Sequence, residues 1–218
     1  DGNIFTPDDL PWADLPSLDQ YEQLLTYNDP SWKDSKKNDF KSIVLLGKIG
    51  RYIDIIDCWV RQDSRSNMVK AHYDLHEMVQ EEFAELIKIK GQNCRVRVCT
   101  HWMEANMAQD LMMDDYFTEG DERGYQLHIR KDERQKPDKF GRIEDMQPLA
   151  SRGWLRCNAA KRKSPDMRNL RDQFLAFPNG HDDGPDSVEG GAAKFQLRAR
   201  IERFGIHTQP RKPRYKSY

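Results

Sequence analysis

The sequence has few of the features that mark secreted or membrane proteins. Its 218 residues include four cysteines, none of them in a CxxC pair. Cysteines with this spacing, in apolar and strand-like surroundings, predict small buried side chains in a reducing compartment rather than disulfides or a zinc site. Uninterrupted apolar runs such as Ile43–Leu46 are far too short to span a bilayer, and no signal peptide precedes them, so we expect no membrane insertion.

The sequence also lacks a phosphate-binding loop. No GxxxxGK[ST] motif is present, and the Gly47–Lys48 pair precedes a predicted strand rather than a helix. The chain as given is therefore not expected to hydrolyse ATP. It has no internal repeat and no low-complexity block, and its length suits one substantial domain with short tails. The first residue is Asp1 rather than methionine, which suggests a domain from a longer protein.

Positive charge is concentrated at the C-terminal end, although the formal net charge is only −1. From Lys194 onward, Glu202 is the single acid among a series of lysines and arginines. This asymmetry predicts local contact with a polyanion, and a solvated tail is the alternative. We divide the chain into a Pro- and Asp-rich linker or docking arm (1–20), a domain (21–205) and a basic tail (206–218).

Hydrophobic periodicity predicts an α/β fold with a mixed sheet and helices on both faces. The predicted strands are 23–28, 40–47, 52–60, 94–102, 125–130 and 154–158. The predicted helices are 67–89, a short one after Asn106, 137–149, 166–176 and 186–203. The first three strands read as an antiparallel meander. The helix at 67–89 then serves as a crossover, so strand 94–102 is expected to lie parallel to the first strand.

Acidic residues stand at the ends of these two strands. Asp29 follows the first strand, in YNDPS, where Pro30 stops the ladder. Glu104 stands just past the strand at 94–102, in HWMEANM. If the two strands are neighbours, their ends lie roughly one or two strand spacings apart.

A third group of acids lies in the stretch at 177–195, FPNGHDDGPDSVEGGAAKF, which opens the last predicted helix. Asp183 and Asp186 are three residues apart, so both carboxylates can lie near the first turn, and Asp182 stands beside them. An acidic N-cap of an ordinary helix is the alternative interpretation. His181, beside this group, is interpreted as a turn-capping histidine or as a proton relay.

Three or four carboxylates that converge at one sheet edge require a counter-charge, because close like charges raise one another's pKa. A divalent cation supplies it. Ligation by oxygen alone selects Mg²⁺ or Mn²⁺ over zinc, so the sequence predicts a site for these ions.

Six segments in order resemble the nuclease domain of the large terminase subunit of tailed bacteriophages, from about residue 23 to 190. They are YNDPS with NDFKSIVLLGK, YIDIIDCWVRQ, the strand ending in MEAN, DKFGRI, PLASRGWLRCN and FPNGHDDGPDSVEG. The resemblance implies an RNase H-like fold. It also implies that Asp29, Glu104, Asp183 and Asp186 are the catalytic metal ligands, with Asp182 as a competitor for Asp183.

The resemblance further implies cleavage of double-stranded DNA during genome packaging, in the cytoplasm of an infected or lysogenic bacterial host. The expected partners are an ATPase domain of the same polypeptide, the portal and the small terminase subunit. Two metal ions about 4 Å apart can activate a water, neutralise the scissile phosphate and stabilise the leaving oxygen.

Five basic residues are candidates for contact with the DNA backbone. Lys139 and Arg142 stand in DKFGRI, where they are equally well explained as paired surface charges. The tail contributes Arg211, Lys212 and Arg214, which could instead dock on another protein. No motif for reading bases is visible.

Two rival functions are consistent with the same acids. Another RNase H-like nuclease, such as a Holliday-junction resolvase, would share the acidic residues and the metal dependence. A non-catalytic DNA- or portal-docking module would use the acids only as structural caps.

Overall fold

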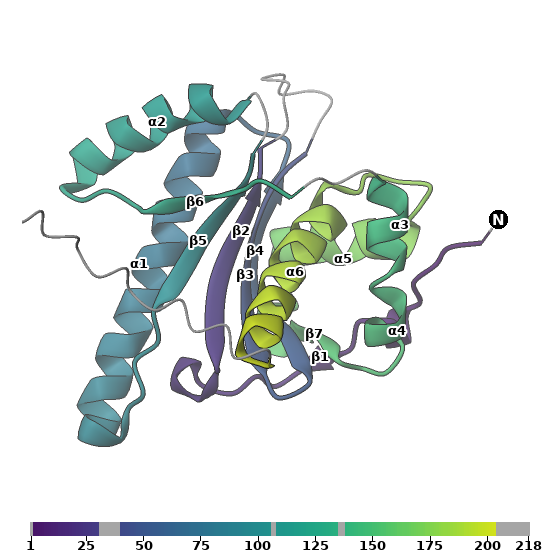
Figure 1. The fold of residues 1–218 in the computed structure, drawn as a ribbon, viewed down its shortest axis with the longest axis horizontal. Helices are drawn as coiled ribbons and strands as arrows, with labels where there is room; N and C mark the ends of the chain where they lie inside the picture. The colour runs from purple at the N-terminus through teal and green to yellow at the C-terminus, as the bar shows by residue number, and fades with distance from the viewer. Residues whose placement is uncertain (1, 31–39, 106–107, 135–137, 204–218) are drawn as a thin grey trace, which may run out of the picture.

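The computed structural model describes residues 2–30, 40–105, 108–134 and 138–203. Within these ranges the chain forms a seven-stranded mixed sheet in the order β1-β7-β4-β3-β2-β5-β6, with helices on both faces (Figure 1). The predicted α/β class and mixed sheet are confirmed. None of the described helices is long and apolar enough to cross a membrane.

The strands are β1 (Trp12–Ala13), β2 (Gln23–Asp29), β3 (Lys41–Ile49), β4 (Tyr52–Arg61), β5 (Cys99–Glu104), β6 (Ile129–Asp132) and β7 (Leu155–Asn158). The α-helices are α1 (Arg65–Lys90), α2 (Ala108–Arg123), α3 (Lys139–Glu144), α4 (Gln147–Ala150), α5 (Pro165–Ala176) and α6 (Asp183–Arg203). Short 3-10 helices occupy Pro7–Asp9, Leu18–Gln20, Gly91–Asn93 and Ala159–Lys161.

The centre of the sheet is the predicted meander. Strands β2, β3 and β4 pair antiparallel, and Gly50 at φ 53° provides the left-handed residue of the β3–β4 turn. Strand β5 pairs parallel with β2 across the α1 crossover, as the strand order predicted. The outer strands β6 and β7 extend the sheet in parallel from β5 and β4.

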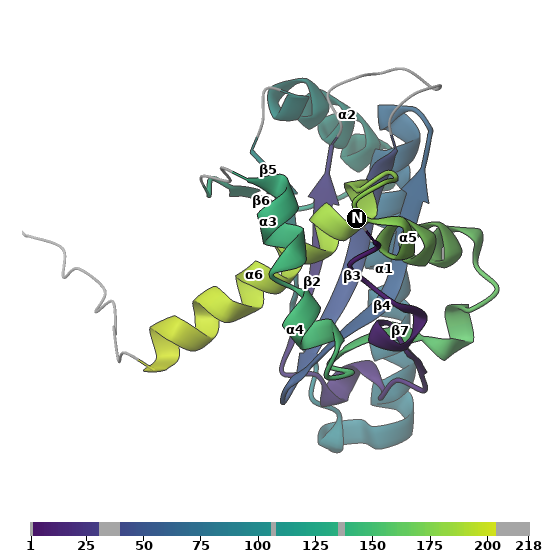
Figure 2. The same cartoon turned by 90° about the vertical axis from the view of Figure 1, so that its right-hand side faces the viewer.

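The two faces of the sheet are covered differently. Helices α1 and α2 lie on one face, whereas α3, α4, α5 and α6 lie on the other (Figures 1 and 2). Helix α1 begins where the Ser64 side chain accepts a hydrogen bond from the Asn67 amide. Its buried stripe includes Met68, Leu75 and Val79 at helical spacing, which is the face that the sequence pattern predicted.

Several predicted elements differ from those observed. Strand β5 begins at Cys99 rather than at residue 94, because its partner β2 begins only at Gln23 and Leu24 pairs with Cys99. Strand β6 covers 129–132 instead of 125–130. The single helix expected at 137–149 is two helices, α3 and α4, with Pro148 in the first turn of the second.

The N-terminal segment expected as a linker or docking arm packs onto the domain. Phe5 and Leu10 are buried in the main core, and Leu18 is buried in a neighbouring cluster. Strand β1 pairs with β7 and forms one edge of the sheet. Residues of this segment therefore contribute to the core of the same fold.

Candidate metal centre

The candidate site forms at the carboxyl ends of the adjacent strands β2 and β5. Asp29 is the last residue of β2, because Pro30 cannot continue the ladder, and Glu104 is the last residue of β5. Asn28 of β2 pairs with Met103 of β5. Side chains alternate along a strand, so the residues that follow, Asp29 and Glu104, both project from the other face of the sheet, toward α6. The parallel register thus places Asp29 beside Glu104.

Helix α6 brings the third carboxylate, Asp186, over the same edge. The helix packs directly on the sheet because Gly190 and Gly191 face it: a Cβ on Gly190 would collide with the ring of Tyr27, and one on Gly191 would lie 2.5 Å from Leu46 Cδ1. Asp186 lies one turn before Gly190 and therefore on the same side of the helix. Its side chain is buried.

Asp29, Glu104 and Asp186 form one cluster, in which each offers a carboxylate oxygen and these oxygens all lie within 4.8 Å of one another. Burial, followed by the charges of Asp186 and Glu104, raises the pKa of Asp29 well above its usual range. Repulsion of this kind is relieved by a cation at the cluster. Because the donors are all oxygen atoms, the residues fit a hard divalent ion such as Mg²⁺ or Mn²⁺.

The other two predicted acids lie at the start of α6 but outside this cluster of three. The backbone carbonyl of Asp183 accepts a hydrogen bond from Ser42 Oγ, and burial raises the pKa of its carboxyl group. Asp182 is half-buried, and one of its carboxylate oxygens lies 2.7 Å from Lys139 Nζ. Of the acids at this turn, the structure therefore brings Asp186 to Asp29 and Glu104.

Lys139 and Arg142, both from α3, lie against these acids. Lys139 Nζ is 3.5 Å from Asp186 Oδ2, and Arg142 Nη1 donates to Asp186 Oδ1 at 2.8 Å. Burial lowers the pKa of Lys139, but the charge of Asp186 and the contact with Asp182 raise it by more, so the pKa is raised overall. Both residues are thus paired charges here, which is one of the two interpretations that the sequence left open.

A row of alternating charges extends from Asp186 along α6. Arg142 also contacts Glu189, Glu189 lies 3.2 Å from Arg134, and Arg134 lies 3.0 Å from Asp132. Lys194 ends the row as a second partner of Asp132. Burial raises the pKa of Asp132, but hydrogen bonds from Lys194 and Tyr27 outweigh this effect and lower the pKa to about 2.

Sequence reasoning did not single out Asp132, Arg134 or Glu189. Asp132 and Arg134 are two residues apart, but Glu189 comes from a distant segment of the chain, so no local spacing connects it to them. Glu189 and Asp186 are three apart on α6, which is the one local sign of a shared acidic face.

Comparisons with known proteins agree with this architecture. No protein-family model matches the sequence, and no curated protein matches it. Among solved structures, the human cytomegalovirus terminase nuclease domain is similar, with a TM-score of 0.56 and 13% identity over 89% of this chain and 94% of that one. The fold is that of terminase nuclease domains.

Two further structures share this terminase nuclease fold. The cytomegalovirus domain soaked with manganese and bound to an inhibitor has a TM-score of 0.53 and 14% identity, over 89% of this chain and 94% of that one. The large terminase of a thermophilic bacteriophage, in complex with ADP, has a TM-score of 0.50 and 10% identity, over 89% of this chain. This chain spans 44% of that large terminase. The resemblance read from the sequence is confirmed at the level of an RNase H-like fold.

Four further residues that the sequence singled out are His181 and three basic residues of the tail. Arg211, Lys212 and Arg214 lie outside the described residues, as does the tail at 206–218. His181 is exposed and packs edge-on against Phe40, with ring centroids 4.7 Å apart.

A buried polar network lies on the other face of β2, beneath the site. His72 is fully buried. Thr26 Oγ1 lies 2.5 Å from His72 Nε2 and 2.8 Å from His101 Nδ1. Tyr116 bridges His72 to Asn28, the residue that precedes Asp29. The network thereby ties the strand that carries Asp29 to α1 and α2.

This network predicts a loss of stability in acid. Burial lowers the pKa of His72 and lowers that of His101 to about 3, so both are neutral in the folded protein, whereas in the unfolded chain they take up protons near pH 6.5. The contribution of the two neutral histidines to the free energy of unfolding is complete above about pH 6.5. It is lost as the pH falls toward 3. At pH 5.5 each histidine should lower the free energy of unfolding by about 1 kcal/mol.

Urea unfolding at pH 7.5 and 5.5 measures this effect. His101→Asn keeps a polar atom near the position of Nδ1 but cannot take up a proton, so its stability should depend less on pH than that of the wild type. Equal pH dependence in the two proteins would show that His101 is not the source.

Proposed function

We propose that this chain is a metal-dependent endonuclease that cuts double-stranded DNA, as the nuclease part of a phage large terminase during genome packaging. The observation that supports it is the cluster of Asp29, Glu104 and Asp186 at one sheet edge. The cluster lies in a fold shared with terminase nuclease domains.

The residues divide the work of phosphodiester hydrolysis as follows. Asp29 is the proposed bridging ligand, because it is buried against the charges of both other acids, and Glu104 and Asp186 are the proposed ligands to one ion or the other. Asp183 is the proposed additional ligand, at the start of the same helix. Bound Mg²⁺ or Mn²⁺, in two sites, would activate water and offset charge on the phosphate. No side chain then needs to act as the nucleophile.

The proposal extends to the setting of the reaction. The large terminase of the thermophilic phage is more than twice as long as the part that this chain matches, and its structure contains ADP. We accordingly place an ATPase domain elsewhere in the same polypeptide, with the portal and the small terminase subunit as partners. The proposed location is the cytoplasm of the bacterial host.

Plasmid digestion tests the proposed activity. The wild type should nick and linearise supercoiled plasmid with Mn²⁺ or Mg²⁺, without strong sequence preference, and should leave it intact with a chelator. A resolvase would instead prefer four-way junctions over linear duplex, so both substrates belong in the assay. DNA binding without cutting under any metal condition would favour the docking module and would refute the nuclease.

A further inference from the structure

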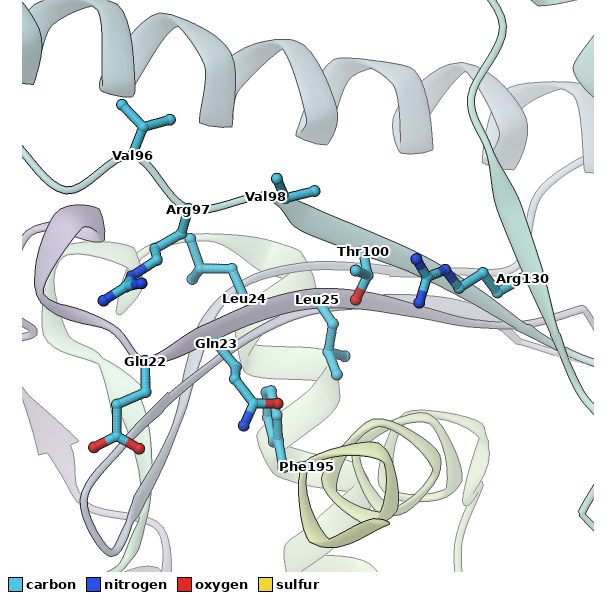
Figure 3. Close-up of a pocket in the computed structure, with 10 residues that line it drawn as sticks. All are labelled: Glu22, Gln23, Leu24, Leu25, Val96, Arg97, Val98, Thr100, Arg130 and Phe195. Atoms are coloured by element: carbon cyan, nitrogen blue, oxygen red, sulfur yellow. The ribbon is translucent and has the colours of Figure 1, made fainter. Parts of the chain in front are cut away.

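A shallow groove of about 530 Å³ opens on the α6 side of the sheet, over β2 and β5. Leu25, Thr100 and Phe195 form its centre, and Arg97 and Arg130 reach into it from its two ends (Figure 3). Helix α6 packs mainly on β2 and β3, and β5 and β6 lie beside it (Figures 1 and 2).

The groove leads to the metal centre along β5. Because side chains alternate along a strand, Thr100, Trp102 and Glu104 of β5 all lie on its α6 face. Trp102 therefore lies between the groove and the acidic cluster. On β6, Arg130 pairs with Trp102 and Asp132 pairs with Glu104. The groove and the cluster therefore belong to one continuous strip of the sheet.

The strip presents a fixed and accessible positive charge. The Arg130 side chain is exposed, and its guanidinium lies 5.6 Å from the Trp102 ring centroid. Lys194 Nζ lies 4.4 Å from the same ring, but its charge is already compensated by Asp132. Arg97 donates to the carbonyl of Tyr21. Within the described residues no carboxylate forms an ion pair with Arg130, so its charge is available to a ligand.

We propose that this strip is a track for the DNA backbone beside the scissile phosphate, with Arg130 as its principal phosphate contact. The inference rests on the proposed nuclease function and deepens it. An arginine held on an aromatic ring keeps its donors oriented at a lower entropic cost, and guanidinium donors match phosphate oxygens. Glu22 lines the end of the groove near Arg97, but the charge of Arg130 and its continuity with the acidic cluster favour a polyanion as the occupant.

Strand geometry gives the spacing of the contact. Arg130 is opposite Trp102, two residues before Glu104, and a strand rises about 3.4 Å per residue, so the offset along the strand is about 7 Å. Because duplex DNA rises about 3.4 Å per base pair, an offset of about 7 Å would place this backbone contact within a few base pairs of the cut.

The test compares Arg130→Ala with Arg152→Ala as a matched control. Arg152 also lies over a tryptophan, Trp154, at 5.1 Å, but beside β7, which β4, β3 and β2 separate from β5. Binding of a labelled duplex is measured in Ca²⁺ across a salt series, cleavage is measured in Mn²⁺, and thermal melting checks the fold. Arg130→Ala should weaken binding about eightfold at 0.1 M salt and reduce the salt slope by about 0.9, the effect of one phosphate contact. Arg152→Ala should match the wild type.

The outcomes separate the track from the function. If the wild type cuts DNA while Arg130→Ala is folded and binds with unchanged affinity and salt slope, the track is wrong and the nuclease stands. If the wild type neither binds nor cuts duplex, the proposed function fails and the track fails with it. Loss of affinity that Arg130→Lys largely restores supports a charge contact at this position.

Discussion

Replacing Asp29 with asparagine is expected to abolish metal-dependent cleavage and, at the same time, to make the metal-free protein harder to unfold. Asp29 is buried beside Glu104 and Asp186, and its raised pKa means that its charge is unfavourable there without a cation. An amide of the same shape removes the repulsion and should raise the unfolding free energy in chelator by about 1 kcal/mol.

The loss of activity should be large. An asparagine offers one neutral oxygen in place of a carboxylate, so the cluster loses charge at a buried position. A metal contributes several kcal/mol to such reactions, and about 4 kcal/mol corresponds to about 10³-fold in rate. Plasmid cleavage rates in Mn²⁺ and melting temperatures in chelator measure the two effects.

The neighbouring acids provide the controls. Asp182→Asn removes a carboxylate paired with Lys139 and outside the cluster of three, so its cleavage rate should fall less than about tenfold. Asp183→Asn, measured in parallel, decides whether that residue is a ligand. An Asp29→Asn protein that still cuts at the wild-type rate would end the proposal that these carboxylates form the catalytic site.

Replacing Arg142 with methionine is expected to destabilise the fold rather than to weaken DNA binding alone. Arg142 contacts both Asp186 and Glu189, whose side chains are 5% and 11% exposed. Removing one partner of a buried ion pair typically costs about 3–5 kcal/mol, because it leaves a charge in the interior without compensation. Arg134 and Lys139 still face these acids, so we expect a loss at the lower end, about 3 kcal/mol, measured by urea unfolding.

A double variant identifies the cause of that loss. In the double variant Arg142→Met with Glu189→Gln, one of the two acids that lost Arg142 as a partner becomes neutral. Part of the lost unfolding free energy should therefore return. If Arg142 instead contacts the DNA backbone, Arg142→Met should keep the wild-type unfolding free energy. The salt slope of its DNA binding should then fall by about one unit. That result would restore the DNA-binding interpretation of Arg142.

The sequence predicts the part of the site that the chain order determines. Alternation and β-branched residues define β2, β3 and β4, and the α1 crossover fixes β5 parallel to β2. Once those strands are adjacent, Asp29 and Glu104 must meet, because each ends its strand at the same edge. This much follows from local pattern and the handedness of crossovers.

The contribution of α6 could not be read in the same way. Asp183 and Asp186 are three apart and both near a helix start, and only the rotation of the helix decides which one faces the strands. That rotation is set by Gly190 and Gly191 against Tyr27 and Leu46, a contact between segments more than a hundred residues apart. The pairing of Arg142 with Glu189 depends on the same docking and was hidden for the same reason.

If the proposed nuclease function holds, the glycine pair also bears on how cutting would be restrained while DNA is moved. With no side chain at Gly190 and Gly191, α6 packs closely on Tyr27 and Leu46, and Asp186 already lies beside Asp29 and Glu104. The carboxylates are thus preassembled before any substrate arrives. We therefore expect that cleavage would be controlled by whether the duplex can reach this edge of the sheet. Separation of the three carboxylates of the cluster would not be needed.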